Sequence, residues 1–437
     1  MLFLTVNLSV SLCFGQNTFQ PPPQNNKIAV QINKSTLPSG FMAGLRLQTT
    51  HRKNNNKSTR GFTYHVDTAL VYSNTINPQR YIYFYDSAGN KVLSYTELMA
   101  NGKWDYVSKD TATYDSVGNR LTSLSKTRID GVWVNASRSV STYTVNHNVV
   151  TKVGKMWVNN SWVYTDSSYY TYDYNGNKVA SFHANRNGSA WVNNSFNLYS
   201  YDSVGNQTLF LSEQWNDSLW VDNQRVIYAY DSASNLVSGL VQNWGDTAWV
   251  NLYRETYTYD SVRNRLSYTG ETWNDSVWVN SQRYVYTYYK FGQVETGIGE
   301  NWKGGAWVNF EKGQYTYDTY GGIETYLYQQ WGNNSVWGNV SLAQYNYDSV
   351  GNAYEGNYYA WDSLDRNWLQ NKDGLFQIYF NYGSEKLFYT GYQVDIKYNA
   401  PLSTGINDGV KDIVSQFTLA PNPARDNTTL SIGLKAQ

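Results

Sequence analysis

Residues 257–288 read YTYDSVRNRLSYTGETWNDSVWVNSQRYVYTY, and the same pattern recurs along most of the chain. The stretch opens with a Tyr-x-Tyr-Asp phrase, passes through Trp273 and Trp278, and returns to alternating tyrosines. A repeat period between about 20 and 50 residues is typical of solenoids, propellers and other arrays. The stretch therefore predicts that one supersecondary unit is copied many times.

Two aromatic series fix the period at 29 residues. The tryptophan series comprises Trp104, Trp133, Trp162, Trp191, Trp220, Trp249, Trp278 and Trp307, and Trp337 and Trp368 continue it with one or two inserted residues. The tyrosine series comprises Tyr85, Tyr114, Tyr143, Tyr172, Tyr201, Tyr230, Tyr259, Tyr288 and Tyr317, followed by Tyr347. Chance does not hold two such series in phase for so long. They predict an array of about ten β-hairpin repeats over residues 61–398.

The repeats share a turn whose typical form is Asp-x-x-Gly-Asn, as in residues 202–206, with Asp in eight of the ten and Gly in seven. Asp at the first position and Gly at the fourth are preferences of a type I turn, and a left-handed Gly then forms the bulge of a short hairpin. His147 stands where the Gly usually falls. The expected structural turn residues are Asp86, Gly89, Asp115, Gly118, Asp173, Gly176, Asp202, Gly205, Asp348 and Gly351.

A second turn lies between paired tryptophans, as in Trp215-Asn216-Asp217-Ser218-Leu219-Trp220. Polar residues between two aromatics predict a four-residue hairpin loop, with the tryptophans facing each other across its neck. Each repeat is therefore expected to contain two strands and two turns.

The strands show period-two alternation, which indicates β-structure. From Trp278 to Tyr288 the even-numbered residues are Trp, Asn, Gln, Tyr, Tyr and Tyr, which alternation alone places on one face. Ten hairpins give about 20 strands, and twisted open sheets rarely exceed about 10. We therefore expect an all-β fold, a long antiparallel meander that coils into a superhelix or shell with its aromatic face inward. β-Propeller-like blades are the alternative.

The composition excludes some partners and fits a wide β-sheet. The chain has 437 residues, with 34 Lys+Arg and 34 Asp+Glu, so the formal net charge is zero. Nucleic acids and anionic membranes need a basic excess, and neither is an expected partner. Aromatic residues make up 17% of the chain, and tyrosine and tryptophan suit half-exposed sheet rather than a thick aliphatic core.

The chain ends differ from the array. Residues 1–15 form an apolar run that is too short to span a bilayer and is expected to be a secretory signal peptide. Cys13, the only cysteine, is the alternative lipidation site. Residues 16–60 are polar and irregular, and residues 399–413 form a loose linker. No other stretch approaches the roughly 18 apolar residues of a membrane helix.

The sequence contains no recognisable catalytic constellation, and no enzyme activity is expected. The four histidines, His51, His65, His147 and His183, are scattered without ligand spacing. Glu271 and Glu300 recur one repeat apart, but most other repeats lack an acid at this position. No cofactor or metal is expected. Calcium at the Asp-x-x-Gly-Asn turns is an alternative, but calcium needs six to eight oxygens, whereas an Asp that caps its own turn needs no metal.

The aromatic ladders are the candidate ligand-binding feature. Identical rings would recur roughly every 9.6 Å if each repeat adds two strands, a spacing that suits the rings of a polysaccharide. The alternative is that the rings only pack against each other across strands. The candidate binding residues are Trp215, Trp220, Trp244, Trp249, Trp273, Trp278, Trp302 and Trp307.

Two parts of the sequence resemble known families. Residues 199–206, Tyr-Ser-Tyr-Asp-Ser-Val-Gly-Asn, resemble the YD repeat of the Rhs and teneurin-like families, whose β-hairpins wind into a hollow spiral shell. The resemblance covers one turn per repeat, and the longer period and the tryptophan half depart from it. Residues 414–437 resemble the opening of the sorting domain of the Bacteroidetes type IX secretion system, here truncated. The matching residues are Pro421, Asn422 and Pro423, and Ala420 replaces the usual aromatic.

Together these features predict a secreted, non-enzymatic repeat protein of the outer cell surface. It would act as an adhesin or as a glycan- or surface-binding module through its tryptophan and tyrosine ladders. A purely structural spacer or shell-forming scaffold with buried aromatics is the alternative. The type IX secretion machinery and a polysaccharide or other surface ligand are the expected partners.

Overall fold

The structure is a computed structural model, and it describes residues 65–399 except 246, 291, 371 and 380–385. All regular secondary structure in this part of the chain is β-strand, and it contains no helix long and apolar enough to cross a membrane. The predictions for residues 1–15, 16–60 and 414–437 lie outside the described residues.

Each hairpin from β3–β4 to β19–β20 supplies a strand of 9 or 10 residues and a strand of 11 or 12 residues. The strands in chain order are β1 (Val66–Tyr72), β2 (Gln79–Tyr85), β3 (Lys91–Ala100), β4 (Lys103–Tyr114), β5 (Arg120–Ile129), β6 (Val132–Tyr143), β7 (Val149–Val158), β8 (Ser161–Tyr172), β9 (Lys178–Asn187), β10 (Ala190–Tyr201), β11 (Gln207–Trp215), β12 (Trp220–Tyr230) and β13 (Leu236–Gly245). They continue with β14 (Ala248–Tyr259), β15 (Arg265–Asn274), β16 (Val277–Tyr288), β17 (Val294–Lys303), β18 (Ala306–Tyr317), β19 (Ile323–Trp331), β20 (Trp337–Tyr347), β21 (Ala353–Asp362), β22 (Asn367–Leu369), β23 (Gly374–Tyr379), β24 (Lys386–Gly391) and β25 (Gln393–Tyr398).

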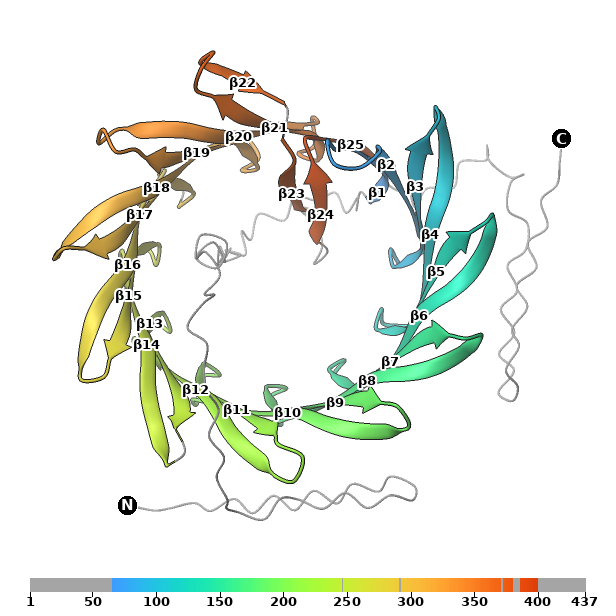
Figure 1. Cartoon of the computed structure of the whole chain (residues 1–437), viewed down its shortest axis with the longest axis horizontal. Coiled ribbons are helices and arrows are strands. Elements are labelled where there is room, and N and C mark those ends of the chain that lie inside the picture. Colours follow the sequence, from blue (N-terminus) through green and yellow to red (C-terminus); the bar gives the residue numbers. More distant parts are fainter. Residues whose placement is uncertain (1–64, 246, 291, 371, 380–385, 400–437) are drawn as a thin grey trace.

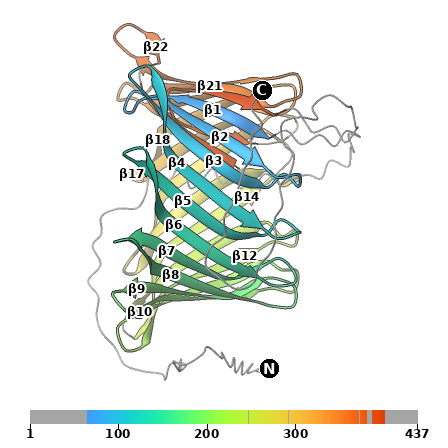
Figure 2. The same cartoon turned by 90° about the vertical axis from the view of Figure 1, so that its right-hand side faces the viewer.

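The expected all-β antiparallel fold is confirmed, but the meander closes into a barrel, so the expected superhelix is wrong, as is the propeller alternative. Strands β1 to β21 pair in sequence order, and β25 inserts between β21 and β1. Its Val394 lies opposite Gly356 of β21 and Val71 of β1. The result is a closed antiparallel barrel of 22 strands, seen end-on in Figure 1 and from the side, with oblique strands, in Figure 2. Strands about 4.8 Å apart and tilted by about 40° make such a ring on the order of 40 Å across.

The hairpin β23–β24 lies inside the ring (Figure 1) and identifies the inner face. The hydroxyls of Tyr389 on β24 and Tyr83 on β2 are 3.1 Å apart, and Phe376 on β23 packs edge-on against Tyr345 of β20. A second set of tyrosines, the mid-strand tyrosine series, lies two residues before the series of Tyr85 and Tyr347 and includes Tyr83 and Tyr345. Because side chains alternate along a strand, this mid-strand series faces inward.

The tryptophans face outward, which differs from the single aromatic face that simple alternation predicts. In the β15–β16 pair, Gly270 lies opposite Gln282 and Glu271 lies opposite Asn280, so Ser281 is an extra residue in β16. Such a β-bulge shifts the alternation by one residue. Trp278 therefore shares the outer face with Glu271, whereas the tyrosines beyond the bulge face inward.

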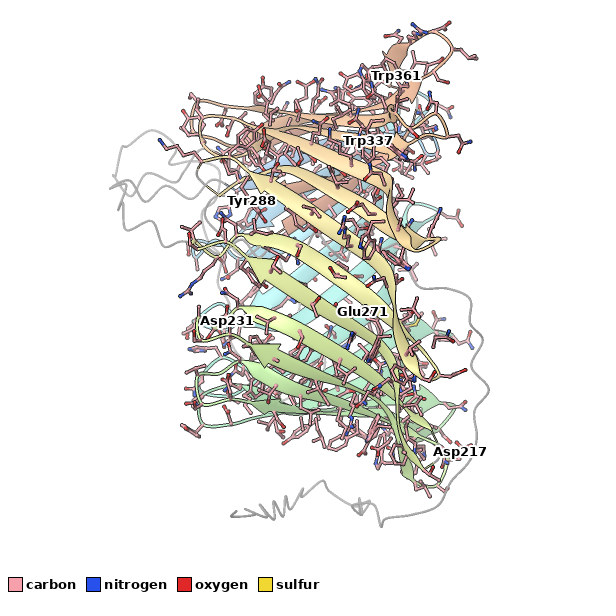
Figure 3. All side chains as sticks on the ribbon, turned by 90° about the vertical axis from the view of Figure 1, so that its left-hand side faces the viewer. Asp217, Asp231, Glu271, Tyr288, Trp337 and Trp361 are labelled. Carbon is pink, nitrogen blue, oxygen red and sulfur yellow. The ribbon has the colours of Figure 1, made fainter. Side chains whose placement is uncertain are left out.

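The two kinds of turn lie at opposite rims of the barrel. In Figure 3, Tyr288 and Asp231 lie near one rim, and Asp217 and Trp337 lie near the other. The Asp-x-x-Gly-Asn turns have the expected left-handed fourth residue, as in Gly205, and His147, Ser234 and Arg263 adopt that conformation where Gly is replaced. Many tryptophan turns are tighter than the expected four-residue loop, because Asn274 already pairs with Val277.

The largest cluster of fully buried side chains lies at the seam where the barrel closes. It contains Val66, Val71, Phe376 and Val394, each at most 1% exposed. A second, smaller cluster around Tyr284, Tyr286 and Tyr315 lines the inner wall at β16–β18. Elsewhere the wall is a single half-buried sheet. Packing is therefore concentrated where β25 and the inner hairpin complete the ring.

Candidate functional site

The aspartate of each Asp-x-x-Gly-Asn turn is used to hold its own turn. In Asp202, Oδ1 accepts hydrogen bonds from the backbone N–H groups of Val204 and Asn206, and Oδ2 accepts one from the Asn206 side chain. The same three bonds recur in the turns that begin at Asp86, Asp115, Asp173, Asp231, Asp260 and Asp348. The side-chain hydrogen bond from Asn177, supported by backbone N–H groups, holds the pKa of Asp173 below its usual range.

These bonds support turn capping as the role of the aspartates. Both oxygens of each such carboxylate already accept hydrogen bonds, so a calcium ion would have to displace them. Within the described ranges no group of three or more His, Cys, Asp or Glu side chains is placed to hold a metal ion. That the turns take no calcium remains a prediction.

The tyrosine just before the turn of each repeat connects neighbouring repeats by a hydrogen bond. The Tyr201 hydroxyl donates a hydrogen bond of 2.9 Å to the carbonyl of Lys178, the first residue after the preceding turn. The equivalent bond, 2.6–3.0 Å long, is made by Tyr114, Tyr143, Tyr172, Tyr230, Tyr259, Tyr288, Tyr317, Tyr347 and Tyr398. This ladder of hydroxyls gives the tyrosine a structural role whether or not an aspartate follows it, as at Tyr143 and Tyr288.

The eight tryptophans predicted as ligand contacts come together as four outward-facing pairs. Trp273 and Trp278 lie opposite each other with ring centroids 5.0 Å apart in an edge-to-face arrangement. The pairs Trp215–Trp220, Trp244–Trp249 and Trp302–Trp307 have the same geometry at 5.1–5.2 Å. All eight rings are half-buried. Edge-to-face pairing contributes about 0.5–1.5 kcal/mol per pair beyond area burial.

An arginine and a glutamate complete each of the best-formed tryptophan sites. The Arg254 guanidinium forms a bidentate pair with Glu271, at 2.5 and 2.8 Å, and its central carbon lies 4.7 Å from the Trp278 ring centroid. The arrangement recurs with Arg283, Glu300 and Trp307, and with Arg80, Glu97 and Trp104. The arginine therefore covers one face of the tryptophan, which leaves less of the ring available to a ligand than the sequence suggests.

Tyrosines pack against each other on one side of the inner wall. Tyr315 and Tyr326 are stacked at 4.8 Å between centroids, and Tyr284 donates a hydrogen bond of 2.6 Å to the nearly buried Glu311. Burial raises the pKa of Glu311, although the hydrogen bonds from Tyr284 and Tyr328 oppose the shift. On this side the rings mainly form the wall itself.

The opposite side of the inner wall has a pocket of about 270 Å³. It spans β5 to β9 and is lined by Arg120, Ser141, Tyr143, Val149, Lys152, Tyr170, Tyr172 and Lys178. The pocket lies where the mid-strand tyrosine series is interrupted. Position 141 is Ser, whereas Tyr170, Tyr199 and Tyr228 occupy the same position in the next three repeats. A small side chain in this register leaves the space that a tyrosine ring fills elsewhere.

Sequence reasoning placed the turns and paired the tryptophans, but it missed the arginine partners and the inner pocket. One signal was present, because Arg225, Arg254 and Arg283 recur 29 residues apart. The pocket is marked in the sequence by the replacement of two successive tyrosines, by Ala112 and Ser141, and by basic residues contributed by several repeats. The predicted sorting residues Pro421, Asn422 and Pro423 lie outside the described residues.

Comparison with models of known protein families gives no match, and comparison with curated proteins gives none. Among solved structures, the chain is similar to part of the TcdB2–TccC3–Cdc42 complex, with 12% identity, a TM-score of 0.27, and coverage of 71% of this chain and 20% of that chain. It is also similar to a porin-like protein from Bacteroides uniformis, with 14% identity, a TM-score of 0.22, and coverage of 57% of this chain and 95% of that chain. A third is a DUF3836 family protein from Bacteroides vulgatus, with 18% identity, a TM-score of 0.19, and coverage of 25% of this chain and 98% of that chain.

The chain thus spans about a fifth of the length of the first of these proteins. Scores at this level establish neither a shared family nor a shared function.

Proposed function

We propose that this chain is an exported, non-enzymatic protein of the outer cell surface that binds a polysaccharide, and that the inner wall of the barrel is its main contact face. The observation that carries the proposal is the inner wall from β8 to β12. There, half-buried Tyr170, Tyr199 and Tyr228 recur one per repeat, with small polar side chains between them.

The polar groups between the tyrosines are arranged as a polar network. Asn197 donates a hydrogen bond of 3.2 Å to the Ser181 hydroxyl, which lies 3.3 Å from the Tyr199 hydroxyl. A sugar ring has apolar C–H faces and a rim of hydroxyls, so it suits aromatic faces that alternate with hydroxyl and amide groups. Each repeat adds two strands, or about 9.6 Å, to the wall. A long polymer could therefore meet equivalent groups in successive repeats.

The outer tryptophan pairs are a second contact face, as the sequence predicts. Trp191 supports it, because this ring is 39% exposed and stands opposite Arg186 rather than a second tryptophan. A purely structural scaffold is the alternative function. Its support is that the tyrosine hydroxyl ladder and the Arg–Glu–Trp groups account for many of the repeated side chains by packing alone.

Export to the surface is also part of the proposal. It rests on the apolar run of residues 1–15 and on the similarity of residues 414–437 to a type IX sorting domain. Deletion of residues 414–437 should retain the protein inside the cell envelope. Surface labelling of intact cells that remains unchanged after the deletion would remove type IX sorting from the proposal.

Binding is tested by titrating the full chain with soluble neutral polysaccharides, such as dextran and laminarin, by calorimetry. Tyr228→Ala, on the main contact face, is expected to weaken binding more than Trp191→Ala, on the second contact face. The reverse result would show that the outer face of the barrel, and not the inner wall, is the main binding face. If neither these neutral polysaccharides nor acidic ones bind the folded protein, the binding proposal is wrong and the scaffold alternative remains.

A further inference from the structure

The pocket between β5 and β9 combines positive charge with aromatic rings. Arg120, Lys152 and Lys178 line it together with Tyr143, Tyr170 and Tyr172, and no acidic residue does. The chain has no net charge, so this group of three cations is a local feature. Charges lining a concave surface concentrate the potential and attract ions of the opposite sign.

No carboxylate of the described residues pairs with these three cations. The Lys178 ammonium lies 4.5 Å from the Tyr199 ring centroid and 5.9 Å from that of Tyr170. These rings position the ammonium without removing its charge, since a cation–π contact supplies no counter-ion.

The repeat sequence explains why the pocket exists at this place. In each of the seven following repeats, the residue equivalent to Ser141 is a tyrosine, the last of which is Tyr345. Ser141 removes one ring from the wall but leaves Tyr170 beside the gap. The gap thus has an aromatic side wall, with cations at its edge. A volume of about 270 Å³ lies near the lower end of the range of about 300–1,000 Å³ for small-molecule sites.

We propose that this pocket binds an acidic sugar unit of a polysaccharide, with the ring in the gap left by Ser141 and its sulfate or carboxylate group near Arg120, Lys152 and Lys178. This inference rests on the proposed function, and it makes acidic polysaccharides the preferred ligand class. Charge-assisted hydrogen bonds from arginine and lysine to such anions are about twice as strong as neutral ones.

The test compares heparin, which carries sulfates, and polygalacturonate, which carries carboxylates, with neutral dextran in calorimetric titrations of the full chain. Lys152→Gln removes one cation, and Ser141→Tyr fills the gap with the side chain of the following repeats. The controls are Lys126→Gln, on the outer face of β5, and Ser261→Tyr, at an exposed residue of the turn between β14 and β15. Circular dichroism establishes that each variant is folded.

We expect Lys152→Gln and Ser141→Tyr each to weaken binding of at least one acidic polymer by about tenfold, and the controls to leave it within about twofold. The affinity of the native chain should also fall with added salt. Dextran binding as tight as that of both acidic polymers would overturn the inference and leave the proposed function in place. Equal losses in Lys126→Gln and Lys152→Gln would also overturn it, because binding would then follow net charge. If none of these three polymers binds and laminarin does not bind either, both the inference and the proposed function are wrong, whereas binding of laminarin alone would overturn only the inference.

Discussion

The Tyr398 hydroxyl donates a hydrogen bond of 2.6 Å to the carbonyl of Ala353. This contact repeats at the seam the bond that Tyr201 makes to Lys178 within the array. β25 therefore takes the place of one more repeat strand. The tyrosine and the residue whose carbonyl it contacts are 45 residues apart at the seam, compared with 23 within the array. The last strand thus carries a tyrosine in the register of the array, in addition to the backbone pairing of β25 with β1 and β21 that closes the ring.

Tyr398→Phe is expected to destabilise the closed barrel by about 1 kcal/mol, the usual net value of one lost hydrogen bond. Limited proteolysis should then cleave first near β1 and β25. Thermal unfolding by circular dichroism measures the loss. Tyr174→Phe is the control, because Tyr174 is 92% exposed. Equal melting temperatures of native protein and Tyr398→Phe would show that the hydroxyl is not needed for closure.

Acid is expected to loosen the Asp-x-x-Gly-Asn turns. Side-chain and backbone hydrogen bonds lower the pKa of Asp173 and Asp231 in the folded chain, relative to about 3.9 in an unfolded chain. The turns therefore contribute their full stability above about pH 4 and lose it as the pH falls through the lowered values. Urea unfolding from about pH 6 to about pH 2 measures this loss. Asp231→Asn should flatten the dependence, and the exposed Asp365→Asn should leave it unchanged. A midpoint independent of pH in the native protein would contradict the prediction.

The local parts of this fold were predictable from the sequence, and the long-range parts were not. Asp202 and Gly205 lie within one turn, so their roles follow from residue type and spacing. Ser281 looks like any other member of an alternating strand, and its bulge, which sends Trp278 outward, depends on the partner strand. Closure depends on β25, which lies outside the regular period. Likewise, the inner pocket depends on Arg120 and Lys178, which are two repeats apart.

Alkali is expected to unfold the barrel through its tyrosines. Burial raises the pKa of Tyr288 to about 12, although Arg265 opposes the shift. A hydroxyl with a raised pKa contributes its full stability below about pH 10 and loses it as the pH rises through the folded-state value. Deprotonation also removes the donor of the 2.7 Å hydrogen bond to the Arg265 carbonyl. Tyrosinate absorbance and circular dichroism should therefore change together above about pH 10. Full ionisation of the tyrosines at about pH 10 with the sheet intact would refute this.

The arginine that covers Trp278 is expected to control the exposure of this ring. Arg254→Ala removes the cation–π contact and leaves Glu271 without its bidentate partner. Since the arginine is 40% exposed, we expect a stability loss of only about 1 kcal/mol, together with greater quenching of tryptophan fluorescence by iodide. Lys303→Ala, at an exposed cation of β17, is the control. Unchanged quenching in Arg254→Ala would mean that the guanidinium does not shield the ring.

The buried seam should make the stability of the ring uneven. Phe376 is fully buried among Tyr345 and Gly356, so Phe376→Ala should cost about 3–5 kcal/mol, as for other phenylalanines in cores. Phe196→Ala, at a half-buried ring on the far side of the barrel, should cost less. If the seam holds the ring closed, hydrogen exchange in Phe376→Ala will rise first in β1, β21 and β25, while β9 to β12 stay protected, since each strand of the array contacts mainly its neighbours. Uniform loss of protection around the whole ring would instead show that the barrel unfolds as one cooperative unit.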